Sequence, residues 1–168
     1  MVQFLSHRPH KTPGPWFTMA VVVLAAYGML IVPTGAASSQ GNKPDFSGHW
    51  VLDKAQSDLG PGPKVDDVTE DIQHHEPVLI ITTITKDAGG ENKRTVRYTT
   101  DGAPNTNQAA GHEMKTTTRW EGDTLVTVVR DEAGLELTES RSLSNDGKTQ
   151  TVETNFGMGK QKLLMVRK

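Results

Sequence analysis

Turn signals recur at nearly constant spacing along the second half of the chain. They are Gly89-Gly90, Asp101-Gly102, Gly111, Gly122, Gly134, Asp146-Gly147 and the glycine-rich stretch 157–159. A spacing of roughly 10 to 13 residues leaves room for one short strand between turns, and no room for the helical crossovers that a parallel sheet needs. The pattern therefore favours a meander of antiparallel strands.

The clearest hairpin surrounds the turn Glu121-Gly122-Asp123. The stretch 125–129 that follows it, Leu-Val-Thr-Val-Val, is rich in the β-branched residues that are typical of strands. Before the turn, alternate positions share one face of the expected strand, and that face carries Met114, Thr116, Thr118 and Trp120. We expect this to be the inner face. A register shifted by one residue, which would place the threonines in solvent, is the alternative.

Strands are also expected at 46–52, 68–74 and 78–85, which brings the total to about ten. In the first of these, Trp50 and Leu52 share a face, and we expect Trp50 to fill the core. The predicted fold is all-β, an up-and-down antiparallel β-barrel, because closure removes the exposed sheet edges that promote aggregation. A two-sheet sandwich is the alternative.

Residues 1–37 have the pattern of a secretory signal peptide. Arg8 and Lys11 precede an apolar run at 19–32, and the small residues after it end at Ala37. The run has about 14 residues, fewer than the roughly 20 that span a bilayer as a helix. We therefore predict an N-terminal signal helix cleaved after Ala37, a flexible segment at 38–43, a barrel domain at 44–168, and a secreted or periplasmic location. Retention as an uncleaved anchor is the alternative.

Composition excludes several classes of function. The 168-residue chain has no cysteine, so it forms no disulfide, no thiolate metal site and no cysteine nucleophile. Loss of residues 1–37 would remove two of the 18 basic residues and none of the 20 acidic ones, which leaves a formal charge of about −4. Because a nucleic-acid-binding surface needs an excess of basic residues, nucleic acid is not an expected partner.

The strand expected at 135–143 carries a charged pair on its apolar face. Leu137, Glu139, Arg141 and Leu143 alternate to one side. Because a buried charge is costly without a partner, one interpretation is that Glu139 and Arg141 neutralise each other or their neighbours. The other is that Arg141 faces a cavity and binds the carboxylate of a ligand through its planar guanidinium.

Histidines and carboxylates raise the question of a metal site at His74, His75 and His112 with Glu76 and Glu113. Adjacent strand residues point to opposite faces, so His74 and His75 cannot both bind one ion without a bend. Solvated histidines near loops are the plainer interpretation. No nucleophile elbow, phosphate-binding glycine loop or His-Glu-x-x-His motif occurs, and the sequence indicates no catalytic residue and no cofactor.

Three short motifs occur in strand order, at 46–52 (Phe-Ser-Gly-His-Trp-Val-Leu), at 120–126 (Trp-Glu-Gly-Asp-Thr-Leu-Val) and at 141–148. They resemble the calycin barrels, especially the fatty-acid-binding proteins, and the chain also resembles lipocalin-like secreted bacterial proteins of unknown function. The resemblance implies a closed barrel, and for Arg141 the role of the inner arginine that holds a fatty-acid carboxylate.

Two features depart from the fatty-acid-binding pattern. The last strand has Leu164 and Val166 where that family has an arginine and a tyrosine. The segment 54–63 is too short and too rich in glycine and proline to form the family's two-helix lid.

The function expected from these observations is the binding of a small hydrophobic or amphipathic molecule inside an exported barrel. Arg141, Trp120 and Met114 are the residues expected to contact it. One alternative is an interaction or scaffold protein of the cell envelope with a packed barrel and no ligand. The other is a small extracytoplasmic enzyme that uses the barrel mouth.

Overall fold

The computed structural model describes residues 43–60, 64–109 and 111–168, and ten strands make up most of this part. The strands are β1 (Gly48–Leu52), β2 (Asp67–His75), β3 (Val78–Asp87), β4 (Gly90–Thr99), β5 (Asp101–Ala109), β6 (His112–Glu121), β7 (Thr124–Asp131), β8 (Glu136–Leu143), β9 (Thr149–Asn155) and β10 (Lys160–Arg167). The predicted signal helix, and all of the predicted 38–43 segment except Lys43, lie outside the described residues.

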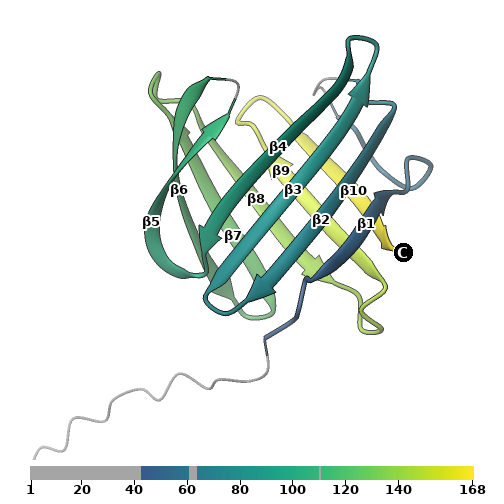
Figure 1. Ribbon diagram of the computed structural model, residues 1–168, viewed down its shortest axis with the longest axis horizontal. Coiled ribbons are helices and arrows are strands. Elements are labelled where there is room, and N and C mark those ends of the chain that lie inside the picture. Colours follow the sequence, from purple (N-terminus) through teal and green to yellow (C-terminus); the bar gives the residue numbers. More distant parts are fainter. Residues whose placement is uncertain (1–42, 61–63, 110) are drawn as a thin grey trace, which may run out of the picture. The chain divides into compact units, whose positions relative to one another are not determined.

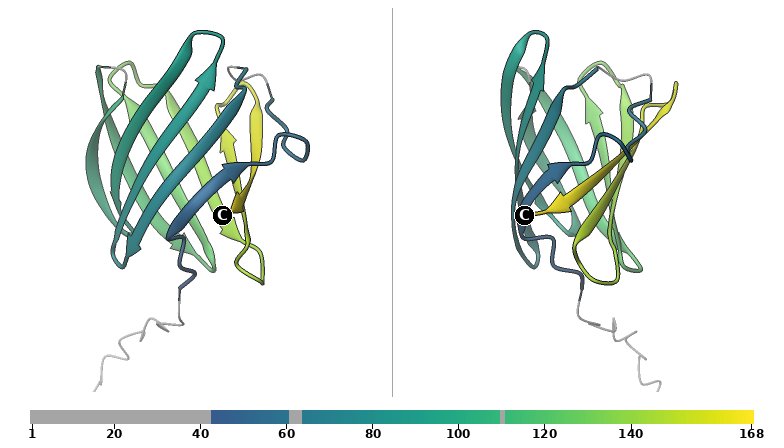
Figure 2. Two further views of the ribbon diagram at one scale, coloured as in Figure 1. Left: turned by 45° about the vertical axis from the view of Figure 1, so that its right-hand side comes forward. Right: turned by 90° about the vertical axis from the view of Figure 1, so that its right-hand side faces the viewer.

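All ten strands belong to one antiparallel sheet with the order β4-β3-β2-β1-β10-β9-β8-β7-β6-β5. Strands that are neighbours in sequence pair with each other everywhere except between β4 and β5, and β1 also pairs with β10. Figures 1 and 2 show how the sheet curls around on itself with tilted strands. The prediction of an all-β up-and-down barrel of about ten strands is thus confirmed, and the sandwich is excluded.

The barrel nearly closes between β4 and β5, its two end strands, through a side chain. Asn107 of β5 accepts the amide N–H of Arg97 at Oδ1 (2.8 Å) and donates from Nδ2 to the carbonyl oxygen of Arg97 (3.0 Å). The side-chain amide thereby replaces one rung of the backbone ladder. A further bond runs from Asn105 Nδ2 to the hydroxyl of Thr99 (2.8 Å).

The core fills the middle and one end of the barrel interior. Its largest fully buried apolar side chains are Trp50, Phe46, Leu79, Ile81, Leu125 and Met165. Burial of an aliphatic or aromatic side chain of this kind contributes about 1.5 to 3 kcal/mol to the free energy of unfolding. Trp50, the predicted core residue, donates its indole N–H to the carbonyl oxygen of Phe46 (2.9 Å), and the guanidinium of Arg167 lies over its ring at 4.6 Å.

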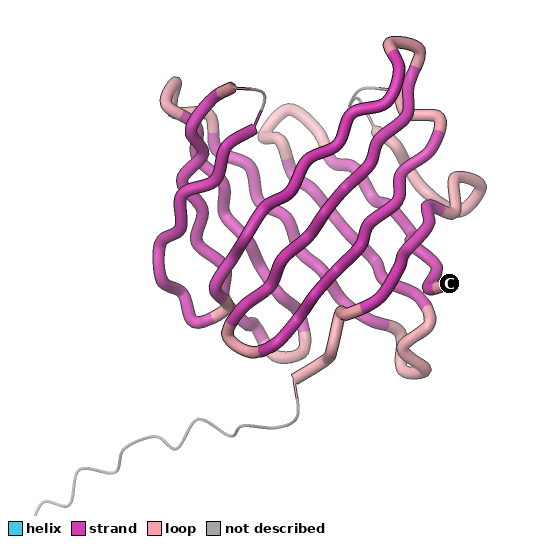
Figure 3. Tube along the Cα trace, in the orientation of Figure 1, coloured by secondary structure: helices cyan, strands magenta, loops and turns pink. Residues whose placement is uncertain are grey.

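The connection from β1 to β2 is built from turns, and no lid helix occurs in its described part. Figure 3 shows only strands and loops in the described part of the chain, where no helix is long and apolar enough to cross a membrane. Asp58 forms an isolated β-bridge with Lys162, so the connection follows β10. Gly60 has φ = 54°, and a Cβ there would lie 2.1 Å from the carbonyl oxygen of Lys160, so the close approach requires glycine.

Candidate ligand site in the barrel

Strand register identifies the side chains that line the interior. Thr118 of β6 lies opposite Thr127 of β7, both are buried, and their hydroxyls hydrogen-bond to each other at 2.9 Å. Thr116 is also buried. The face of β6 that carries Thr116 and Thr118, together with Met114 and Trp120, is therefore the inner one, as predicted, and the shifted register is excluded.

Arg141 belongs to a buried charged cluster, formed with Glu70, Glu139 and Gln150. Its two terminal nitrogens donate to the two carboxylate oxygens of Glu70 at 2.7 and 3.0 Å, and its Nε donates to Glu139 at 2.7 Å. Gln150 donates to Glu70 at 3.1 Å and accepts from Arg141 at 3.4 Å. The side chains of Arg141 and Glu70 are 6% and 7% exposed, whereas that of Glu139 is 18% exposed. Arg141 is thus paired with carboxylates of the protein itself.

The charges of this cluster determine the protonation of its neighbours. Burial by itself lowers the pKa of Arg141, but the carboxylates of Glu139 and Glu70 outweigh burial and raise the pKa above its ordinary value. Tyr98 of β4 faces the same cluster. Burial, followed by the negative charge of Glu139, raises the pKa of its phenol well above the ordinary value, so Tyr98 remains a neutral hydroxyl.

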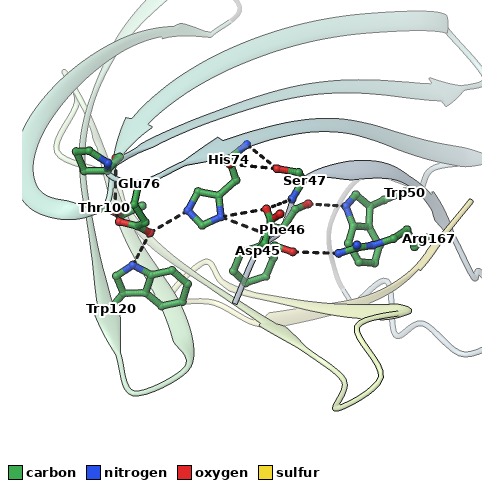
Figure 4. A network of polar contacts seen from close by, with 10 residues as sticks. Asp45, Phe46, Ser47, Trp50, His74, Glu76, Thr100, Trp120 and Arg167 are labelled. Atoms are coloured by element: carbon green, nitrogen blue, oxygen red, sulfur yellow. Dashed lines mark hydrogen bonds and ion pairs between the residues drawn. The ribbon is translucent and has the colours of Figure 1, made fainter. Parts of the chain in front are cut away.

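Aromatic side chains close one end of the barrel (Figure 4). The ring of Phe46, which precedes β1 and is fully buried, lies 6.0 Å from the ring centres of both His74 and Trp120. Trp120 donates its indole N–H to Glu76 at 2.8 Å, and the hydroxyl of Thr100 donates to the other carboxylate oxygen of Glu76. This end of the interior is therefore sealed by packing and hydrogen bonds together.

His74 connects the two sides of the sealed end. Its Nδ1 lies 3.3 Å from the amide nitrogen of Phe46, and its Nε2 lies 2.9 Å from Glu76. Because the amide of Phe46 can only donate, Nδ1 of His74 is the acceptor. The ring proton is therefore on Nε2, which donates a hydrogen bond to Glu76. Burial raises the pKa of Glu76, but hydrogen bonds from Thr100, Trp120 and His74 outweigh it and hold the pKa below its ordinary value.

The inner wall is partly exposed at the opposite end, which we call the open end, although Val68, Thr116 and Thr154 are buried there. The inner-face side chains of intermediate exposure there are Thr83, Thr85, Met114, Val129, Leu137, Gln161 and Leu163. Hydroxyl and amide groups alternate with aliphatic ones along this wall. Such a surface can contact both the polar and the apolar part of a small molecule.

Two hollows on the described surface are lined mostly by other residues. One of about 440 Å³ is lined by residues of β8, β9 and β10, namely Thr138, Ser140, Glu153, Thr154, Asn155, Lys160, Gln161 and Lys162. Another of about 260 Å³ is lined by Glu113, Lys115, Asp131 and Glu132. Neither is lined by Arg141, Trp120 or Met114.

The three predicted ligand contacts share the inner wall but lie at different depths. Trp120 belongs to the sealed end, and Met114, six residues earlier on the same strand, lies at the open end, roughly 20 Å away along β6. Arg141 is closer to Trp120, since Leu125 lies opposite both in the strand register. The structure therefore does not gather these residues into one cluster, and their contact with a ligand stays a prediction.

The histidines considered for a metal site do not converge on one point. His74 is buried on the inner face at the end of β2, whereas the next residue, His75, is exposed. His112 begins β6 at the open end. In the described ranges, no three histidine or carboxylate side chains are arranged to hold a metal ion.

Comparison with known proteins identifies the fold. Neither a protein-family model nor a curated protein sequence matches the chain. The crystal structure of wild-type fluorescent protein UnaG matches with a TM-score of 0.59 and 17% identity, over 73% of this chain and 97% of that one. Secretory abundant heat soluble protein 4 from Ramazzottius varieornatus matches with a TM-score of 0.58 and 14% identity, over 75% and 96%. The chain has a calycin-type β-barrel fold. This confirms the resemblance seen in its motifs, and identities this low concern the fold alone.

Within this calycin-type barrel, sequence reasoning missed the principal partner of Arg141. Glu70 lies on the inner face of β2 between Val68 and Ile72. A lone acidic residue in an otherwise apolar alternation is the same signal that marked Arg141 in β8. The alternation could therefore have marked Glu70 as an inward-facing charge, although not as the partner of Arg141.

Proposed function

We propose that this protein binds a small amphipathic molecule at the open end of its barrel. The observation that carries the proposal is the difference between the two ends. One is sealed by Phe46, His74 and Trp120, whereas at the other several inner-wall side chains are partly exposed. A concave wall that combines aliphatic side chains with a few polar groups is typical of sites for small molecules.

The open end supplies both kinds of contact. Met114, Val129 and Leu137 offer apolar surface to the body of a ligand, and Val129 lies directly opposite Leu137 in the register. Deeper in, the partly exposed Glu139 offers a polar contact. Export is part of this proposal, and it is supported by the signal-peptide pattern of residues 1–37.

Titration with Nile red, an uncharged dye that fluoresces in apolar surroundings, tests the proposal. Met114→Trp should fill the open end and abolish saturable dye binding by the full-length chain. Lys115→Trp is the matched control, because Lys115 is adjacent on β6 and points outward, where it is exposed. Both variants retain residues 1–37, so any dye bound by that apolar segment cancels in the comparison. Equal binding by the two variants would refute a site at the open end.

A packed barrel that acts through its surface is the second candidate function. The observation in its favour is that the middle and the sealed end of the interior are filled by fully buried side chains, Trp50, Phe46 and Leu79 among them. A folded wild-type chain that binds no Nile red would support this candidate, and the search would then move to protein partners.

A further inference from the structure

The charge of the barrel interior favours one class of ligand over another. At pH 7 the formal charges of Glu70, Glu139 and Arg141 add up to −1, and all three side chains lie on the inner wall. Glu70 is enclosed and bonded to Arg141 and Gln150. The unbalanced negative charge is therefore presented by Glu139, which is the most exposed of the three.

The guanidinium of Arg141 has little capacity for a ligand anion. Both terminal nitrogens donate to Glu70, and Nε donates to Glu139. A ligand carboxylate would have to displace one of these resident carboxylates or approach them at close range. Either route is unfavourable, because like charges repel strongly where water is excluded.

Tyr98 provides a second polar group on the inner wall near Glu139. Its side chain is 6% exposed and lies on the inner face of β4, and the charge of Glu139 adds to burial in raising the pKa of its phenol. The phenol therefore stays neutral, and a neutral phenol can accept a hydrogen bond from a ligand donor.

One basic residue on the inner wall, Arg94, would instead attract an anionic ligand. Arg94 shares the inner face of β4 with Tyr98 and lies opposite Thr83 at the open end. Its side chain is exposed, so water and salt screen its charge. Asp131, opposite Met114 at the same end, carries the opposite sign.

We propose that the barrel selects ligands with a cationic head group, an organic ammonium or amidinium on an apolar body, and that Glu139 with Tyr98 receives this head group. The inference rests on the proposed function and specifies its ligand class. Arg141 is then a positioning residue, because it holds Glu139 through Nε and does not itself contact the ligand. In this proposal the ligand carboxylate expected at Arg141 gives way to a ligand cation at Glu139.

Displacement of Nile red by three molecules of equal length tests the inference. Octylamine, octanol and octanoate carry a positive charge, no charge and a negative charge at pH 7. We expect octylamine to bind the full-length chain about tenfold to a hundredfold more tightly than octanoate, with octanol between them, as for the gain of one charge-assisted hydrogen bond.

Replacement of Glu139 by a neutral residue tests whether it causes the preference for octylamine. Glu139→Gln should reduce the preference for octylamine over octanoate about tenfold and leave octanol unchanged. Glu136→Gln is the matched control, since Glu136 lies on the same strand, is exposed and pairs with Arg130. It should keep the wild-type preference.

The possible outcomes distinguish failure of the cationic preference from failure of ligand binding itself. Displacement by all three molecules with equal affinity, or tightest binding of octanoate, would overturn the cationic preference and leave the binding site in place. An unchanged preference in Glu139→Gln would overturn the role of that residue. If wild type binds no Nile red and none of the three molecules, both the function and the ligand class are wrong.

Discussion

Replacement of Glu70 by glutamine tests the buried charged cluster most directly. The side chain keeps its size, but the group that accepts three hydrogen bonds from Arg141 and Gln150 loses its charge. Arg141 is 6% exposed, so water cannot replace the lost carboxylate, and Glu139 is its only remaining charged partner among the described residues. Breaking a buried ion pair costs about 3 to 5 kcal/mol. Because Glu139 remains, we expect a loss of about 3 kcal/mol of unfolding free energy.

Urea denaturation followed by tryptophan fluorescence measures this loss. Glu91→Gln is the control, since Glu91 forms a solvent-exposed ion pair with Lys86 at 3.6 Å and should change stability by less than about 1 kcal/mol. The double variant Glu70→Leu with Arg141→Met should be more stable than Glu70→Gln alone, because it leaves no buried guanidinium that has lost its principal carboxylate. A Glu70→Gln protein within about 1 kcal/mol of wild type would refute the conclusion that the cluster is shielded from water.

Three further predictions concern hydrogen bonds elsewhere. Asn107→Ala should accelerate amide hydrogen exchange at the β4–β5 seam and cost about 1 to 3 kcal/mol, whereas exposed Gln108→Ala should do neither. Thr118→Val should cost about 1 to 3 kcal/mol in urea melts, and adding Thr127→Val should restore much of it, because both buried partners are then apolar. Glu76 has a lowered pKa in the folded protein. Its contribution to the free energy of unfolding is therefore complete above about pH 4.5 and is lost as the pH falls through that lowered value. Glu76→Gln should make stability depend less on pH in this acidic range. An unchanged dependence would contradict the lowered pKa of Glu76.

The regular turn spacing and the period-two alternation were sufficient to predict the fold. Each turn signal from Gly89-Gly90 to 157–159 lies between two strands of the barrel or at the start of the second one, and the alternation in β6 correctly assigned the inner face to Thr116 and Thr118. These features are local, because the direction of a side chain in a strand depends only on its position along that strand. The sealed end was partly predictable, since Trp50 was expected in the core and is fully buried.

Pairing between distant strands is what the sequence alone left undetermined. Arg141 could have faced a ligand or a resident carboxylate, and the choice depends on Glu70, which is 71 residues away in the chain and adjacent only after the barrel closes. The Asn107 bond that bridges the seam likewise exists only because β4 and β5 meet at the ends of the sheet. Local alternation determined which side chains point inward. Closure of the barrel decided which charges meet there, because Coulomb and hydrogen-bond energies depend on distances between strands that no local pattern contains.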